Sequence, residues 1–479
     1  MLRPAQCVGA FLLLLELSLR AATVTLGWDP SADSSVVGFR LYYGVASHSY
    51  PSMLDAGDAT TAAISNLLDG VTYYVAATTY DAAGLESDYS TEVSFTVSLG
   101  TNSSGSNSSG SNSSGSNSSG TNSSGTNSSA SNSSASNSSA SNSLPQVRGT
   151  YSGLFSEPDQ VRQQSAGAFA ISVSGRGAYS GYLQLGPNRL GFSGRLDSTG
   201  QATKAFRRRG GNLNLELSLN ASNQSATASG QLISDSWTAI VGGSRSVFDP
   251  KTNPAPFAGN YILTIPGQSG SAALPAGTGF GGVHINRAGR VTLAGTLADG
   301  KSFNQSAQIS ADSLWPLYAP LYTGNGLLWS WVICTNQSTS NLLGQLTWLK
   351  PPNSRAMFYP AGFTLESQAV GSSYQAPPNA SATAFDLNNA LLAFSDGSLS
   401  SDLTNSLATI PSMPGFATGN GVRMTFSRST GTFHGFVTVP GSGHTVLFRG
   451  AALQTVGSGY GFLLDAGQSS LVTLTPPAH

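Results

Sequence analysis

A group of aromatic residues is the part of the sequence best suited to binding a ligand. Flat aromatic rings stack on sugar rings and offer a large amphipathic surface at a low cost in conformational entropy. Trp329 and Trp331 are two residues apart and lie on one side of a strand, which is equally typical of a core face. Core packing is the favoured interpretation because large aromatic residues are mostly buried, and ligand binding stays the alternative. The candidate ligand contacts are Trp315, Tyr318, Tyr322, Trp329 and Trp331, with Trp348 close by.

Residues suited to catalysis are few. The histidines follow no zinc-binding spacing, and no acidic residue completes a site beside His434 and His444, whereas a zinc site needs converging ligands. The sequence holds no Gly-x-Ser-x-Gly elbow, His-Glu-x-x-His motif, phosphate-binding loop or EF-hand string. The acidic residues are scattered, so paired carboxylates for glycoside hydrolysis stay open but are not favoured. We therefore expect no catalytic residue, no metal ion and no cofactor.

The charge content separates several classes of partner. The chain has 479 residues, of which 22 are basic and 23 acidic, so that charged residues make up 9%, against about 25% in an average protein. The net charge of −1 argues against a nucleic-acid partner, which needs a basic face, and against an electrostatic membrane anchor. The run Arg207-Arg208-Arg209 is the main basic segment and is expected to be a solvated loop.

The first residues have the layout of a secretory signal peptide. Arg3 supplies the positive region, Phe11 to Leu19 the apolar stretch, and Ala21-Ala22 a small-residue cleavage site. The sequence therefore predicts a signal peptide over residues 1–22 and a protein that is secreted or on the cell surface of a bacterium. Once the signal is removed Cys334 is the remaining cysteine, so no internal disulfide is expected.

A pentapeptide repeat of the type Thr/Ser-Asn-Ser-Ser-Gly/Ala runs from Thr101 to Ser143. None of its residues buries apolar surface, so nothing offsets the entropy of ordering the backbone. A coil of this composition spans roughly 35 Å. The sequence therefore predicts a disordered linker over residues 99–145 between a small N-terminal module and a large C-terminal region.

The N-terminal module, residues 23–98, consists of short alternating segments bounded by turn residues, which is typical of a two-sheet sandwich. Three of its motifs are Val24-Thr-Leu-Gly-Trp28-Asp-Pro30, Gly38-Phe-Arg-Leu-Tyr-Tyr-Gly44 and Tyr80-Asp-Ala-Ala-Gly-Leu-Glu-Ser87. Together with Leu67-Leu-Asp-Gly-Val-Thr-Tyr73, they make the module resemble a fibronectin type III domain of bacterial extracellular proteins. The expected strands are Thr23–Trp28, Gly38–Gly44, Thr61–Leu67, Thr72–Asp81 and Thr91–Val97.

This resemblance implies structural roles. Trp28 would be the buried tryptophan of the second strand, and the hydroxyl of Tyr73 would reach the backbone near Leu67. The family supplies no catalysis, and the Arg-Gly-Asp loop of its adhesive members does not occur here.

The C-terminal region repeats a β-strand pattern rich in glycine. Gly177-Ala-Tyr179-Ser-Gly181 matches Gly431-Thr-Phe433-His-Gly435, and each is followed by a Phe-x-Gly triplet. Two segments also begin alike, with Gly149-Thr-Tyr151 and Gly259-Asn-Tyr261. The pattern predicts antiparallel meanders that curl into barrel-like sheets. We expect three units, over 146–252, 257–352 and 353–479, and they resemble Gly-rich β-repeats of bacterial secreted proteins that have no assigned activity.

The expected fold class is thus all-β: a sandwich, a linker and repeated meander units. The expected function is non-catalytic adhesion, scaffolding or ligand binding outside the cytoplasm, with an extracellular polysaccharide or a cell-surface protein as partner. A secreted carbohydrate-active enzyme or its accessory module is one alternative, and a purely structural envelope protein is the other.

Overall fold

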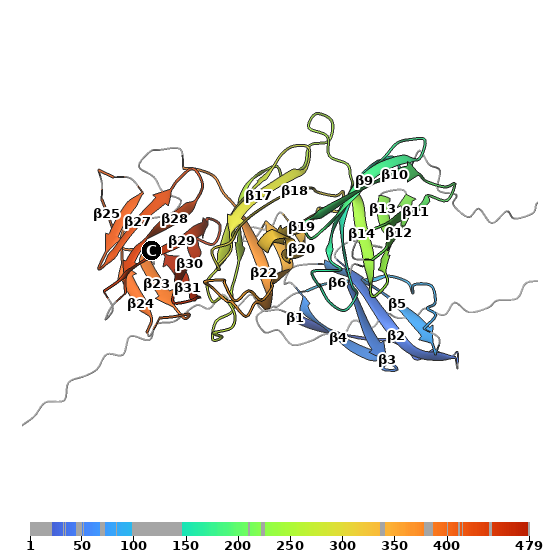
Figure 1. Cartoon of the computed structure of the whole chain (residues 1–479), viewed down its shortest axis with the longest axis horizontal. Helices are drawn as coiled ribbons and strands as arrows, with labels where there is room; N and C mark the ends of the chain where they lie inside the picture. Colours follow the sequence, from blue (N-terminus) through green and yellow to red (C-terminus); the bar gives the residue numbers. More distant parts are fainter. Residues whose placement is uncertain are drawn as a thin grey trace, which may run out of the picture. The chain divides into compact units, whose positions relative to one another are not determined.

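The computed structural model describes residues 22–97 and 146–477. Within these ranges it omits residues 32, 34, 45–49, 51, 68–71, 83, 209–210, 222–225, 336–340, 378–386, 400, 411, 414 and 440–442. The expected linker and the expected signal peptide, except for its last residue Ala22, lie outside the described residues. The regular elements in the described part are β-strands and one short 3-10 helix, η1(Tyr322–Gly324), which confirms the all-β class (Figure 1). The same residues contain no helix long and apolar enough to cross a membrane.

The N-terminal module has two sheets. One pairs β1 with β4, and the other has the strand order β3-β2-β5-β6. Phe39 and Leu41 of β2 and Val75 of β5 are buried, whereas several of their neighbours along the strands are more exposed. One face of these strands therefore packs against a core. The strands are β1(Ala22–Gly27), β2(Val36–Gly44), β3(Ser52–Gly57), β4(Thr61–Leu67), β5(Thr72–Asp81) and β6(Val93–Thr96).

The three residues assigned structural roles in this module have different outcomes. Trp28 follows β1 and is half-buried instead of buried, and its ring centroid is 5.6 Å from that of Phe39. Tyr73 is buried and stacks on Phe95. Leu67 ends β4, and its hydrogen bond with Tyr73 stays a prediction.

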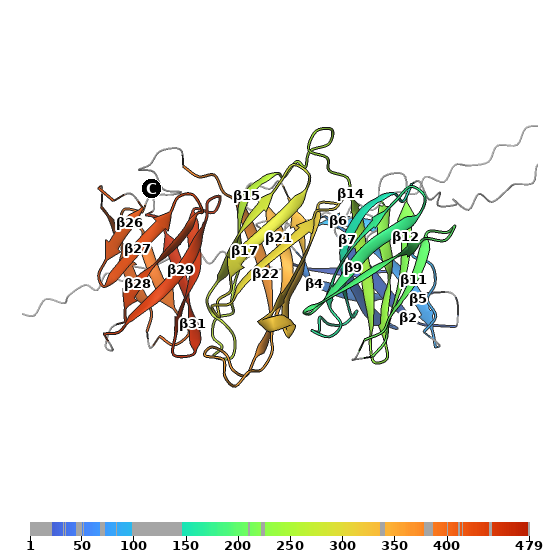
Figure 2. The same ribbon diagram turned by 45° about the horizontal axis from the view of Figure 1, so that its top comes forward.

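The C-terminal region contains three sheets that each curl on themselves (Figure 2). In the first sheet the order is β10-β9-β8-β7-β14-β13-β12-β11, so the first strand along the chain pairs with the last. A meander of eight strands paired in this way forms a barrel whose interior is just wide enough for side chains. We call this sheet the first barrel. Its strands are β7(Gly149–Ser156), β8(Gly167–Val173), β9(Ala178–Leu185), β10(Asn188–Arg195), β11(Gln201–Phe206), β12(Leu213–Ala221), β13(Ala226–Ser234) and β14(Thr238–Ser246).

The second barrel repeats this topology, with the order β18-β17-β16-β15-β22-β21-β20-β19. Its interior is filled by a cluster of buried apolar side chains that includes Trp315, Trp348 and Phe303. Its strands are β15(Gly259–Ile265), β16(Gly279–Ile285), β17(Arg290–Thr296), β18(Ser302–Gln308), β19(Leu314–Leu321), β20(Gly326–Cys334), β21(Leu342–Lys350) and β22(Phe363–Ser373).

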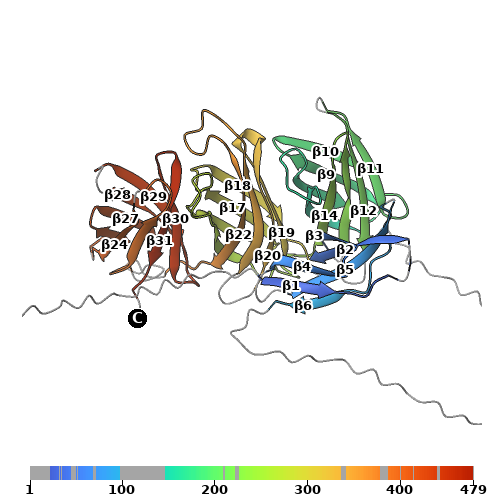
Figure 3. The same cartoon turned by 90° about the horizontal axis from the view of Figure 1, so that it is seen from below.

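The third barrel has nine strands in the order β24-β23-β31-β30-β29-β28-β27-β26-β25. The two edge strands β24 and β25 flank a single buried residue, Leu407. Because β24 pairs with β23 and β25 pairs with β26, they act as one bent strand that closes the barrel. Figure 3 shows this barrel from below. The strands are β23(Leu391–Ser395), β24(Leu403–Ser406), β25(Ala408–Thr409), β26(Phe416–Gly419), β27(Val422–Ser427), β28(Thr432–Thr438), β29(Thr445–Leu453), β30(Ser458–Asp465) and β31(Gln468–Thr475).

The structure places one boundary differently from the sequence prediction. The second unit was expected to end at residue 352, but β22 pairs with both β15 and β21 and completes the second barrel as far as Ser373. The Pro351-Pro352 pair therefore lies in a loop of the second barrel, and the strands of the third barrel begin at Leu391.

The repeated sequence template has a physical explanation. Tyr179 of β9 faces Gly194 of β10, and a Cβ atom at Gly194 would lie 2.6 Å from the Tyr179 hydroxyl. In the third barrel Phe433 faces Gly450, where a Cβ atom would lie 2.2 Å from the ring. The glycine of each Phe-x-Gly triplet thus leaves room for an aromatic ring on the neighbouring strand.

The repeated Gly-x-Tyr start is explained by a hydrogen bond. The hydroxyl of Tyr151 donates to the carbonyl of Val147 at 2.7 Å, and that of Tyr261 donates to the carbonyl of Phe257 at 2.6 Å. Each bond fastens the segment before the first strand of its barrel. Tyr151→Phe is expected to lower the free energy of unfolding by about 1 kcal/mol, because a buried carbonyl loses its partner. Urea denaturation measures this change, and Tyr182→Phe, whose ring lies beside Arg189, is the matched control that should change little.

Candidate functional site

The candidate site lies where turns of the first and second barrels meet. The backbone N–H of Gly186, in the turn between β9 and β10, donates to the hydroxyl of Tyr318 at 2.8 Å. The side-chain amide of Gln163, in the segment between β7 and β8, donates to the carbonyl of Gly324 at 2.7 Å. These two hydrogen bonds fix loops of the first barrel against the turn between β19 and β20.

That turn has an unusual backbone. Tyr322, Thr323 and Gly324 have φ angles of 48°, 59° and 89°, in the left-handed region that non-glycine residues rarely adopt. For Tyr322 and Thr323 this backbone conformation costs about 1–3 kcal/mol each, and it persists because the surrounding structure holds it in place. A Cβ atom at Gly324 would lie 2.4 Å from Cδ of Pro187, so glycine is required for the close approach of the two barrels.

A buried ion pair lies beneath this turn. Nζ of Lys350, at the end of β21, is 2.5 Å from Oδ2 of Asp299, and the two side chains are 7% and 1% exposed. The hydroxyl of Tyr322 donates to the same carboxylate oxygen at 2.7 Å, and Nε1 of Trp348 donates to the Tyr322 hydroxyl at 3.0 Å. Burial, followed by the charge of Asp299, raises the pKa of Tyr322. The phenol therefore stays protonated and donates to Asp299.

A pocket of about 540 Å³ opens beside this pair. An adjoining pocket of about 430 Å³ shares Gln163, Asn325 and Lys350 with it and adds Arg162. Both cations are neutralised, because Lys350 pairs with Asp299 and Arg162 pairs with the buried Glu157. Apart from the paired Lys350 and from Ala356, the larger pocket is lined by amide, hydroxyl and proline side chains. Its lining consists of Gln163, Tyr322, Thr323, Asn325, Lys350, Pro351, Pro352, Asn353 and Ala356.

The structure divides the five aromatic candidates among three environments. Trp315 lies inside the second barrel, fully buried, together with Trp348. Tyr318, Trp329 and Trp331 pack with Leu154 and Ala166 of the first barrel. Tyr322 is the one member of the group that lines the pocket. Core packing, the favoured interpretation, therefore applies to Trp315. Trp329 and Trp331 face outward from the second barrel and contact the first barrel.

The other pocket residues were not among the sequence-based candidates. Gln163, Thr323, Asn325 and Asn353 are polar loop residues of a kind common throughout this chain. The pocket combines residues that are nearly 200 positions apart in the sequence. A local sequence pattern cannot predict that such distant residues lie together.

Potential metal ligands are dispersed over the described residues. Among them no three His, Cys, Asp or Glu side chains gather in a group that could hold a metal ion. Cys334 is buried in the second barrel, and burial raises the pKa of its thiol to about 12, so the reactive thiolate is suppressed.

The chain is similar to several solved structures at low identity. No protein-family model and no curated protein matches this chain. Among solved structures, intact Ap-TbpB with its N and C lobes aligns over 95% of this chain and 98% of its own, at 7% identity and a TM-score of 0.18. Transferrin binding protein B of Neisseria meningitidis aligns over 69% and 76%, at 10% identity and a TM-score of 0.18. A protein with unknown function from Nostoc punctiforme aligns over 70% and 97%, at 7% identity and a TM-score of 0.15. These scores are too low to indicate a shared arrangement.

Proposed function

We propose that this protein is an exported, non-catalytic ligand-binding protein whose pocket between the first and second barrels holds a neutral, polyhydroxylated ligand such as a unit of an extracellular glycan. The barrel interiors are filled with side chains, so the ligand binds between barrels and not within one. The N-terminal sequence supports export. The two-sheet arrangement of residues 22–97 supports a fibronectin type III-like module, which the repeat linker joins to the binding region.

The lining of the pocket carries the proposal. A neutral sugar offers hydroxyl groups that donate and accept hydrogen bonds, and the amides of Gln163, Asn325 and Asn353 do both. Pro351, Pro352 and the Tyr322 ring add apolar surface for the C–H face of a sugar ring. An anionic ligand is disfavoured because the cations at the pocket already have carboxylate partners.

A glycoside hydrolase needs two carboxyl groups about 5–10 Å apart across its cleft. The lining of this pocket includes no aspartate or glutamate. The geometry of the pocket thus favours binding over hydrolysis.

The test is a glycan-array screen with the full chain, followed by calorimetry on the glycan that it selects. Asn325→Ala is expected to weaken binding at least tenfold, about 1.4 kcal/mol, because a side-chain amide at the pocket is lost. Asn304→Ala, on the outer strand β18, is the matched control and should bind like the unchanged protein.

Two results would overturn the proposal. Equal binding by both variants would place the ligand elsewhere. Release of shortened oligosaccharides from the selected glycan would show an enzyme.

A further inference from the structure

Negative charge is concentrated in the N-terminal module. Residues 22–97 include nine aspartates and glutamates, no lysine, and a single basic residue, Arg40, whereas the whole chain has a net charge of −1. A module with this excess of negative charge attracts positively charged molecules over distances of about a Debye length. The module is therefore expected to attract a cationic partner.

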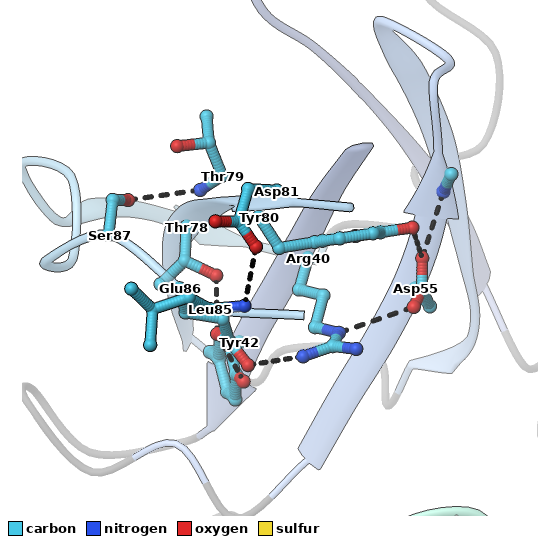
Figure 4. A network of polar contacts seen from close by, with 11 residues as sticks. Arg40, Tyr42, Asp55, Thr78, Thr79, Tyr80, Asp81, Leu85, Glu86 and Ser87 are labelled. Carbon is cyan, nitrogen blue, oxygen red and sulfur yellow. Dashed lines mark hydrogen bonds and ion pairs between the residues drawn. The ribbon is translucent and has the colours of Figure 1, made fainter. Parts of the chain in front are cut away.

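One sheet of the module has a surface that fits such a partner. Arg40 of β2 lies opposite Asp55 of β3 and Thr78 of β5, so the three form one row across the sheet. Phe39 and Leu41 beside Arg40 are buried, and because side chains alternate along a strand, the Arg40 row lies on the outer face. Figure 4 shows these side chains together with Glu86 and Tyr42.

Arg40 is held at the centre of this face. Its Nε donates to Oδ2 of Asp55 at 3.2 Å, and its Nη1 pairs with Oε1 of Glu86. Its guanidinium carbon lies 4.6 Å from the centre of the Tyr80 ring. A cation between carboxylates and over an aromatic ring is a favourable arrangement, and the face thus already contains one example of it.

The acidic groups of the face are fixed in place. Tyr42 and Thr78 each donate to Oε2 of Glu86 at 2.7 Å, and Tyr80 donates to Oδ1 of Asp55 at 3.1 Å. Partial burial alone would raise the pKa of Glu86, but the hydrogen bonds from Thr78, Tyr42 and Arg40 hold it below its ordinary value. Glu86 is therefore ionised at neutral pH and has a fixed position.

Gly38 allows the Tyr80 ring to lie against the sheet. A Cβ atom at Gly38 would be 2.3 Å from Cζ of Tyr80. The ring lies across β2 for this reason.

Aromatic rings extend the face beyond these groups. Tyr89 is 55% exposed and contacts Tyr42 and Tyr50, with centroid distances of 5.1 and 5.4 Å. The hydroxyl of Tyr50 donates to Glu92 at 2.6 Å. Tyrosine and arginine are enriched in protein interfaces, and a tyrosine ring offers a large, rigid, amphipathic surface. We call the set Arg40, Tyr42, Asp55, Tyr80, Glu86 and Tyr89 the tyrosine–carboxylate face.

We propose that the tyrosine–carboxylate face binds a lysine- and arginine-rich segment of another protein. Asp55 and Glu86 carry two negative charges against the single positive charge of Arg40, so the face keeps a negative charge that attracts the cations of the partner. The exposed Tyr89 ring takes a side chain of the partner in cation–π contact, as Tyr80 takes Arg40. Charge complementarity selects a basic partner, and the fixed rings select a polypeptide over a free ion. This function is independent of the pocket between the barrels.

The test uses the full chain and a fluorescent peptide of alternating lysine and glycine, with fluorescence anisotropy at low and physiological salt. Tyr89→Ala is expected to weaken binding at least fivefold without changing the net charge, and Val37→Ala, which also trims an exposed side chain, is its control. Asp55→Asn is expected to weaken binding about tenfold. Asp29→Asn removes the same charge from an exposed position just after β1, a strand of the other sheet, and should have less than a twofold effect.

Each remaining outcome counts against the proposal. Equal losses for Asp55→Asn and Asp29→Asn would mean that net charge alone attracts the peptide. Unchanged binding by Tyr89→Ala would exclude the face as the contact. Displacement of the peptide by spermine, added so that its total positive charge equals that of the peptide, would indicate a site for small cations instead of a polypeptide. Circular dichroism confirms that each variant is folded.

Discussion

Lys350→Met is expected to lower the free energy of unfolding of the C-terminal region by about 3–5 kcal/mol, because it leaves the carboxylate of Asp299 buried without its cation. Asp299 is 1% exposed, and Tyr322 supplies one hydrogen bond to it. The backbone N–H of Lys301 donates to the other carboxylate oxygen at 3.0 Å, but neutral donors do not replace a charge at this depth. The loss is measured by chemical denaturation followed by tryptophan fluorescence.

The paired change Asp299→Asn with Lys350→Met is the control for this prediction. Removing both charges removes the cost of the unpaired carboxylate, so the double variant should recover much of the stability that Lys350→Met loses. A loss below about 1 kcal/mol for Lys350→Met would contradict the buried ion pair, since exposed pairs contribute that little.

Trp348→Ala is expected to destabilise the second barrel by about 3–5 kcal/mol, the range for removing a large aromatic side chain from a core. The ring is fully buried, and its centroid is 4.8 Å from that of Phe363. The change also removes the donor to the Tyr322 hydroxyl, which loosens the turn beside the pocket. Denaturation measures the free energy, and binding of the selected glycan should weaken as well.

Trp331→Ala is the matched control for Trp348→Ala, because it removes the same ring from the outer side of the barrel. Trp331 packs against the first barrel with Leu154. We expect Trp331→Ala to lower the free energy of unfolding by less than Trp348→Ala does. We also expect the first and second barrels to unfold in two separate transitions. Equal losses for the two variants would contradict the assignment of one ring to the core and the other to the contact between barrels.

The sequence predicted the fold class and the repeats well, because alternation and turn glycines are local features. The Tyr179–Gly194 and Phe433–Gly450 pairs explain the template that the sequence shows. The second barrel ends at Ser373 instead of residue 352, because its closure depends on pairing between β22 and β15, which lie about a hundred residues apart.

The candidate site was less predictable. The sequence offered the tryptophans as alternative sugar contacts. In the structure they pack in two different places, inside the second barrel and between the first and second barrels. The pocket residues Gln163, Asn325 and Asn353 are polar and resemble the rest of a chain poor in charge. Only the tertiary contact of Gln163 with Gly324 brings them together.

The most direct test of the proposed binding site is hydrogen–deuterium exchange of the full chain with and without the glycan selected by the array. The proposal predicts slower exchange in residues 157–166, 322–325 and 350–356, which come from both barrels and surround the pocket. Slower exchange confined to other segments, or no change at these three, would contradict it.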